Sequence, residues 1–167
     1  MDRFNAKFNT NTLEILDASG RSVRVFRSDD KPMEWPKDRD IPDYWIRPHQ
    51  PLATSAGLHR FVWDLHYAPP LAQSYEYPIS AVYANTWLNP RGPWAHPGMY
   101  TARLTANGKT LEQRFEVKLD PRVKTSPAGM QAQFDLSMRA YAGMNDTMRA
   151  LEDVKAVRAG LQAAAAK

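Results

Sequence analysis

Residues 12–27 (TLEILDASGRSVRVFR) alternate between apolar and polar side chains on both sides of a short turn. The turn is Asp17-Ala-Ser-Gly20, and the apolar positions around it are Leu13, Ile15, Val23 and Val25. Successive side chains of a strand point to opposite faces, so the alternation predicts two half-buried strands. We expect strands at 12–17 and 21–27, joined as an antiparallel hairpin.

A second hairpin is predicted at 98–106 (GMYTARLTA) and 110–119 (TLEQRFEVKL). The two alternating stretches flank Asn107-Gly108. Asn-Gly is the residue pair that two-residue hairpin turns prefer, because both positions need a positive φ.

A further strand is predicted at 58–67, where alternation would divide the side chains between two faces. The expected core face holds His59, Phe61, Trp63 and Leu65, and the expected outer face holds Arg60, Val62, Asp64 and His66. Together with the second hairpin, this face predicts a core made of Phe61, Trp63, Leu65, Tyr100, Phe115 and Val117.

Two stretches rich in proline and aromatic residues, 28–56 and 68–97, show no periodicity. Such segments must run over the surface as loops, and the first is expected to be anchored by Trp35, Tyr44 and Trp45. The second is about 30 residues long, which is unusual inside a compact domain unless the loop is functional or covers a partner.

The last 40 residues change to a helical period. Ser126-Pro127 is a good N-cap and first-turn pair, and apolar residues follow at intervals of three or four: Met130, Phe134, Met138, Tyr141, Met144, Met148, Leu151 and Val154. A continuous helix to Ala166 would be about 55–60 Å long, with Gly143 and Gly160 as its weak points. This stripe is longer than a domain of ~110 residues covers, so we expect a homo-oligomer formed through the helical arm.

Composition adds few positive indications. The 22 basic and 18 acidic residues are interspersed and give a net charge of +4, so nucleic acid is not an expected partner. The absence of cysteine excludes disulfides and thiolate metal sites. No run approaches the ~20 apolar residues of a membrane span, and the polar start predicts no signal peptide in this chain and suggests a truncation.

Several of these segments occur together, in the same order, in a known kind of module. The stretches LEILDASGRSVRVF, GLHRFVWDL, PGMYTARLTANGKTLEQRFEVKLDPR and QAQFDLSMRAY resemble the C-terminal module of bacterial sortilin-like (BNR-type) β-propeller proteins, often labelled glycosyl hydrolases. The resemblance covers residues 12–150, and His66 departs from it at a position where we would expect a basic residue such as arginine.

The resemblance implies a mainly β protein, an antiparallel immunoglobulin-like β-sandwich with a long C-terminal α-helical arm. The implied division is an unmatched N-terminal segment (1–11), the sandwich (12–121) and the arm (122–167). Relatives of this kind would be secreted or periplasmic, whereas the compartment of this chain stays open. The resemblance carries over no enzymatic residue.

Asp64 and His66 are candidate catalytic residues, because side chains two apart on a strand share a face. A carboxylate and an imidazole there could converge on a metal or a water molecule. The alternative is a polar outer face with an ordinary cross-strand pair.

Asp38, Asp40 and Asp43 are candidate metal ligands. Three carboxylates within six residues of a loop suit Ca²⁺, which takes six to eight oxygen ligands at variable angles. The interleaved Lys37 and Arg39 favour the alternative, a solvated loop of mixed charge.

No complete catalytic motif is present: the chain has no zinc-binding histidine motif, no nucleophile elbow and no glycine-rich phosphate loop. Aromatic residues of the second loop could instead stack on a small acyl or carbohydrate ligand, or simply fill the core: Tyr75, Tyr77, Tyr83, Trp87 and Trp94.

Two functions are therefore expected. The first is a non-catalytic accessory module that binds or scaffolds. The alternative is a small Ca²⁺-dependent hydrolase of lactones or esters, such as acyl-homoserine lactones, in which the cation polarises the carbonyl and activates water.

Overall fold

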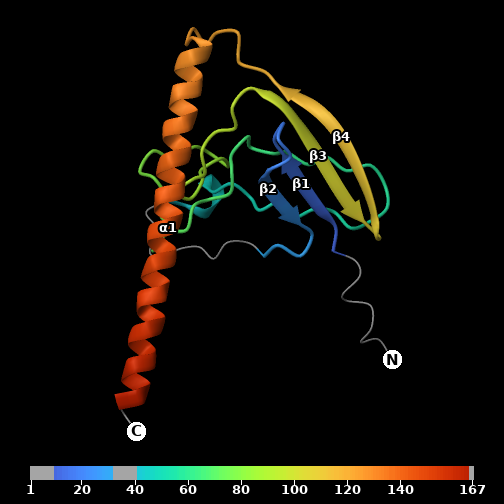
Figure 1. The fold of residues 1–167 in the computed structure, drawn as a ribbon. Helices are drawn as coiled ribbons and strands as arrows, with labels where there is room; N and C mark the ends of the chain where they lie inside the picture. Colours follow the sequence, from blue (N-terminus) through green and yellow to red (C-terminus); the bar gives the residue numbers. More distant parts are fainter. Residues whose placement is uncertain (1–9, 32–40, 166–167) are drawn as a thin grey trace, which may run out of the picture.

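The computed structural model describes residues 10–31 and 41–165 of the 167-residue chain. Its strands are β1 (Thr12–Leu16), β2 (Ser22–Arg27), β3 (Gly98–Ala106) and β4 (Lys109–Val117). A 3-10 turn, η1 (Asp43–Trp45), precedes β3, and the helix α1 (Pro127–Ala165) ends the chain. The strands form one sheet in the order β2-β1-β3-β4, and all its neighbours are antiparallel (Figure 1).

Both predicted hairpins are confirmed. In the first, the Asp17 carboxylate accepts hydrogen bonds from the backbone N–H groups of Ser19 and Arg21 at 2.9 and 3.0 Å. In the second, Asn107 and Gly108 have φ angles of 50° and 72°, as the Asn-Gly turn requires.

The first hairpin contains a bulge that the alternation did not predict. The register between β1 and β2 shifts between Ile15 and Leu16, and Ile15 then pairs with Arg24. Residues directly opposite in antiparallel strands share a face, so Arg24 lies on the face of the buried Ile15. Val25 pairs with Glu14 on the other face and is 39% exposed.

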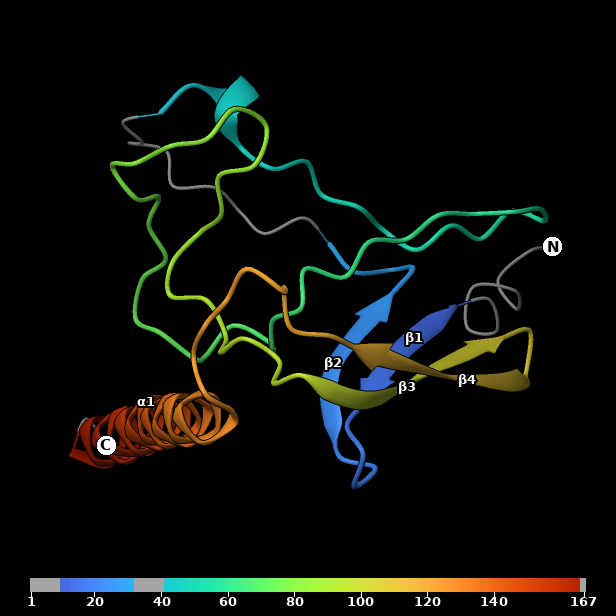
Figure 2. The ribbon, with the colours of Figure 1, turned by 90° about the horizontal axis from the view of Figure 1, so that it is seen from above.

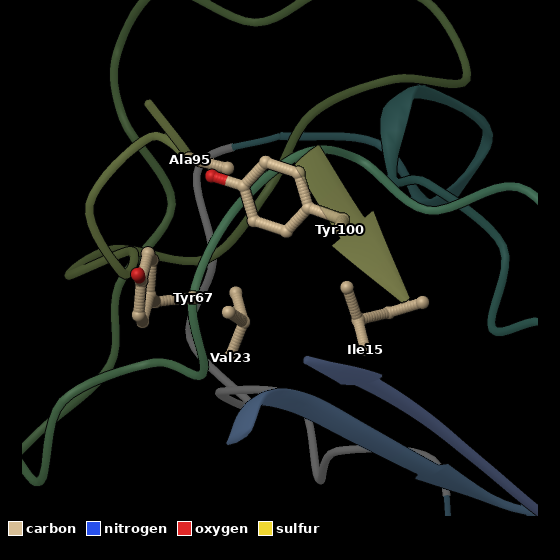
Figure 3. Packing of buried hydrophobic residues seen from close by; sticks show 5 residues of the cluster. All are labelled: Ile15, Val23, Tyr67, Ala95 and Tyr100. Carbon is tan, nitrogen blue, oxygen red and sulfur yellow. The ribbon is translucent and has the colours of Figure 1, made fainter. Parts of the chain in front are cut away.

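The core lies on one face of the sheet and is completed by loop residues. Ile15, Val23 and Tyr100 come from the strands, and Tyr67 and Ala95 come from the loops (Figure 3). The Tyr100 hydroxyl donates a hydrogen bond to the His96 carbonyl at 2.6 Å, and burial raises its pKa to about 12. The loops are therefore part of the core and not a cover added to it.

The prediction of a strand at 58–67 is wrong. The segment is extended, but only His66 forms a bridge, with Trp94. The ladder is limited to hydrogen bonds from Tyr67 N–H to the Pro93 carbonyl (2.9 Å) and from Ala95 N–H to the Leu65 carbonyl (2.7 Å). Leu65 has a φ of 59°, a left-handed conformation that ends the alternation of side chains.

The predicted core is correct in part, because this turn changes which side chains are buried. Tyr100 is buried as expected, whereas Phe61, Trp63, Phe115 and Val117 are half-buried. Leu65 and His59 are exposed, and His66, which alternation assigns to the outer face, is buried together with Tyr67.

The fold class is confirmed only as an antiparallel sheet followed by a long helix. The described strands form a single sheet, so neither the mainly β class nor the sandwich is confirmed for this part of the chain. Where a second sheet would pack, the core face meets the loop residues Tyr67 and Ala95.

The predicted helix is confirmed as one continuous element of 39 residues, which passes through Gly143 and Gly160 without a break. The Ser126 hydroxyl caps it by accepting a hydrogen bond from the Gly129 N–H at 3.1 Å. Its first half packs beside the loops, and its C-terminal half reaches beyond the rest of the described chain (Figures 1 and 2). No helix within residues 10–31 and 41–165 is long and apolar enough to cross a membrane.

Candidate functional site

A cavity of about 320 Å³ lies between β2 and the loops. Arg24 and Phe26 of β2 contribute one wall, and the segments 46–50, 61–69 and 86–92 contribute the others. Its volume is at the lower end of the range of small-molecule pockets, which run from about 300 to 1,000 Å³.

Three arginines from different parts of the chain meet at this cavity. The guanidinium carbons of Arg47 and Arg91 lie 4.4 and 4.9 Å from the centre of the Trp87 ring, which is a cation–π arrangement. Arg24 donates a hydrogen bond to the Tyr67 carbonyl at 2.8 Å. These contacts hold the guanidinium groups in place, since a stacked planar group has little rotational freedom.

Positive charge exceeds negative charge among the lining residues. Five of them are arginine or lysine, and only two, Asp30 and Asp64, are acidic. Burial lowers the pKa of both Arg24 and Arg91, and the charge of Asp64 opposes this shift at each. The positive charges of Arg24 and Arg91 are thus only partly balanced by Asp64, and an anion in the cavity would stabilise them.

The structure places Asp64 and His66 at the cavity, but each already has its own partner. The Asp64 carboxylate pairs with Arg91 at 3.8 Å and accepts a long hydrogen bond from the His66 backbone N–H at 3.3 Å. The His66 imidazole Nδ1 lies 2.6 Å from the Gly92 carbonyl, and the ring lies against Trp94 with centroids 3.9 Å apart. The predicted shared face therefore does not form, because residue 65 is not in a strand conformation.

Burial lowers the pKa of His66, and the Gly92 hydrogen bond and the Asp64 charge oppose this effect only in part. Nδ1 acts as the donor to the carbonyl, so Nε2 of the neutral ring is an acceptor. Both this Nε2 and the Nε of Arg91 are buried without a hydrogen-bond partner among the described residues. Buried polar atoms of this kind are rare, and these two belong to residues that line the cavity.

Gly92 is required by the close approach of two loop segments. A Cβ at this position would collide with the backbone carbonyl oxygens of Tyr67 and Ala68. The same backbone contact brings the Gly92 carbonyl to His66. No side chain larger than hydrogen fits there without a shift of the backbone.

Of the predicted calcium ligands, Asp38 and Asp40 lie outside the described residues. Asp43 begins η1 and is exposed. Residues 10–31 and 41–165 contain no group of three or more histidine, aspartate or glutamate side chains that could hold a metal ion. The calcium site stays a prediction from the sequence.

The aromatic residues of the second loop have different positions. Tyr77 and Trp87 line the cavity, whereas Tyr83 is 70% exposed and lies near Tyr44, with ring centroids 6.3 Å apart. The Tyr75 hydroxyl donates a hydrogen bond to the Pro70 carbonyl at 2.7 Å. Only part of this predicted stacking surface therefore faces a ligand-sized space.

The three arginines were missed in the sequence. Arg47 and Arg91 lie in loops without periodicity, and Arg24 lies between two valines at what alternation marks as an outward position. The bulge in the first hairpin reverses that assignment. The one available signal was the arginine content of loops that are also rich in tryptophan.

No protein-family model matches the chain, and no match was found among curated proteins or among solved structures. The family resemblance is thus neither supported nor opposed by these comparisons.

Proposed function

We propose that this chain is a non-catalytic, ligand-binding accessory module whose cavity binds a small organic anion, in particular an acyl carboxylate. The observation that carries the proposal is the convergence of Arg24, Arg47 and Arg91 on one partly apolar cavity with two acidic residues. Guanidinium groups match carboxylates in geometry, and they bind them through pairs of parallel hydrogen bonds.

The walls favour an acyl group over a sugar. Phe26 and Phe61 line the cavity and offer apolar surface to an alkyl chain. Trp87, the side chain on which a sugar ring would stack, is already covered by the guanidinium groups of Arg47 and Arg91.

The unpartnered nitrogens support the same ligand. A carboxylate accepts hydrogen bonds and so suits the Nε–H of Arg91. The Nε2 of neutral His66 is an acceptor, and it would need a hydroxyl or a water molecule beside the ligand. A hydroxy acid in its carboxylate form would therefore suit both atoms.

We also propose that the chain is the immunoglobulin-like sandwich module of a propeller-associated protein. Residues 65–67 and 93–95 pair over the core face, where a second sheet of a sandwich packs. An accessory module of this kind would place its ligand beside the rest of a larger protein.

The hydrolase alternative rests on the sequence. Asp64 is paired with Arg91, and the Nδ1 of His66 is bound to the Gly92 carbonyl, so the two side chains do not form the carboxylate–imidazole pair that the alternative expects. An assay of the purified protein on lactones and esters, with and without a chelator, distinguishes the two functions. Metal-dependent turnover would refute the non-catalytic module and favour the hydrolase.

The binding proposal is tested by calorimetry with octanoate as the probe. Arg24→Met and Arg91→Met are each expected to weaken binding at least about tenfold, because each removes a charged hydrogen-bond donor. Arg114→Met is the matched control, since Arg114 lies on β4 and does not line the cavity. Equal affinity in all three variants would refute the proposed site.

A further inference from the structure

The helix α1 has two opposite apolar faces, and only one of them is covered by the chain itself. The packed face consists of Phe134, Met138, Tyr141, Asn145 and Met148. Phe134 and Tyr141 lie 6.0 and 6.5 Å from the Tyr67 ring, and the Asn145 side chain accepts a hydrogen bond from the Leu71 N–H at 2.8 Å. The methionine stripe that the sequence assigns to an oligomer contact is thus largely used within the chain.

The free face consists of eight exposed residues on the other side of the helix: Leu136, Ala140, Gly143, Thr147, Ala150, Val154, Val157 and Leu161. At 3.6 residues per turn these positions lie about 180° from the packed face. In Figure 2 the rest of the described chain lies on one side of α1, which leaves the other side open.

The large members of the free face are strongly exposed. Leu136, Val154, Val157 and Leu161 retain 60, 65, 63 and 68% of their accessible surface. The Thr147 hydroxyl donates to the Gly143 carbonyl at 2.8 Å, so its hydrogen-bond donor is already used within the helix.

The spacing along the free face is that of a coiled coil. The eight positions follow one another at intervals of four and three without exception, which is the heptad pattern of a helix that packs on another helix. The stretch from Leu136 to Leu161 is about 38 Å long.

The order of large and small residues identifies the partner. We propose that the free face binds the same face of a second copy of this chain, with the two helices antiparallel. In the register that pairs Leu136 of one copy with Leu161 of the other, Ala140 meets Val157, Gly143 meets Val154, and Thr147 meets Ala150. Each valine is opposite a small residue, so one separation of the helix axes suits the central layers.

A parallel pair does not have this property. In register, it would place Ala140 opposite Ala140 and Gly143 opposite Gly143 in the first half, and valine opposite valine in the second half, with leucine opposite leucine at each end. No single separation of the axes would suit the central layers of both halves. In the antiparallel register, by contrast, the free face is complementary to itself, as the contact of a two-fold symmetric dimer must be.

The residues beside the free face make an apolar contact on one side of the antiparallel pair, and they bring two acidic residues together on the other side. Met144, which is 40% exposed, lies beside Leu151 of the second copy and extends the apolar contact. On the other flank Asp146 approaches Asp153 of the second copy, although Asp146 is already paired with Arg149 at 3.0 Å. Asp153→Lys is therefore expected to tighten the dimer.

Sedimentation equilibrium of the full chain tests the dimer. We expect a dimer at micromolar concentration and a monomer with native circular dichroism for the double variant Val154→Glu, Val157→Glu. Ala156→Glu is the matched control, because Ala156 is exposed in the same stretch but lies off the free face. A monomer at 100 µM for the unmutated chain, or a monomer only for the control, would overturn the proposal.

Cross-linking tests the register, since the chain has no cysteine of its own. Ala140→Cys and Val157→Cys are prepared as separate proteins and joined with a short thiol cross-linker. The antiparallel register predicts cross-linking in the mixture and none in either protein alone. Cross-linking within either protein alone, without a mixed product, would contradict it.

Discussion

The sheet and the loop region beside it reach order by different routes. In the sheet, each hairpin is specified by a few neighbouring residues, such as Asp17 and its turn or Asn107-Gly108. In the loop region, order comes from contacts distant in sequence, such as Arg47 with Trp87 and His66 with Gly92. The cavity belongs mainly to the second region, so its chemistry depends on packing that short sequence patterns do not encode.

The two regions are joined by one aromatic cluster. Trp63 of the loop region lies 5.6 Å from Tyr100 and 6.3 Å from Phe115 of the sheet, centre to centre, in edge-to-face arrangements. Its indole N–H also donates to the His66 carbonyl at 2.9 Å. Changes at this cluster are expected to affect both regions, and changes elsewhere only one.

The largest effect is expected from Trp63→Ala. The substitution removes a large side chain from the cluster and an indole hydrogen bond from the cavity wall, which should lower the free energy of unfolding by about 3 kcal/mol. Urea denaturation measures it. Leu111→Ala is the control, because Leu111 is 69% exposed and should change stability by less than about 0.5 kcal/mol.

Gly92→Ala should destabilise the loop region while leaving the sheet intact. The added methyl group collides with the backbone carbonyls of Tyr67 and Ala68, at an expected cost of about 2 kcal/mol. Hydrogen exchange should show loss of protection at Tyr67 and Ala95 but not in β3 and β4. Gly160→Ala, where the new methyl group meets open space, is not expected to destabilise the chain.

Tyr100→Phe tests the contribution of the sheet residue Tyr100 to stability. It removes the hydrogen bond to His96 and should cost about 1 kcal/mol at neutral pH. The raised pKa of Tyr100, about 12, means that the unfolded chain loses this proton first, near pH 10. Native stability should thus fall between pH 10 and 12, and the fall should be smaller in Tyr100→Phe than in the unmutated protein.

A smaller effect is expected from His66 at mildly acidic pH. Its pKa is lowered, so the unfolded chain takes up a proton first as the pH falls below about 6.5, and stability present above that pH is lost. The charged groups that act on it are Arg91 and Arg24, which lower the pKa, and Asp64, which raises it. Thermal melts from pH 7.5 to 5 should show a shallower decline for His66→Asn than for the matched His59→Asn.

The sequence predicts well those parts that short-range physics determines. The two hairpins and the helix follow from alternation, turn residues and a cap that act within a few positions. Residues 58–67 alternate equally well, but the segment pairs with another loop only through the bridge between His66 and Trp94. In addition, Leu65 leaves the extended conformation. Alternation shows that a segment can form a strand, and it does not show whether a partner strand exists.

The candidate site was less predictable for the same reason. Asp64 and His66 were found, but their roles were assigned from a strand geometry that is absent. Alternation alone would put Arg24 on the outer face, and the bulge reverses this, because one bulged residue changes the side on which every following residue lies. The cavity forms only when loops about 40 residues apart pack together, which periodicity does not show.

We propose that the cavity selects a small organic anion by its charge. Isothermal titration of the protein with octanoate and with octanamide, which share the alkyl chain and differ in charge, tests it most directly. We predict that octanoate binds at least about tenfold more tightly than octanamide and that added salt narrows the difference. Equal binding of the two compounds, or no binding of octanoate at millimolar concentration, would contradict the account.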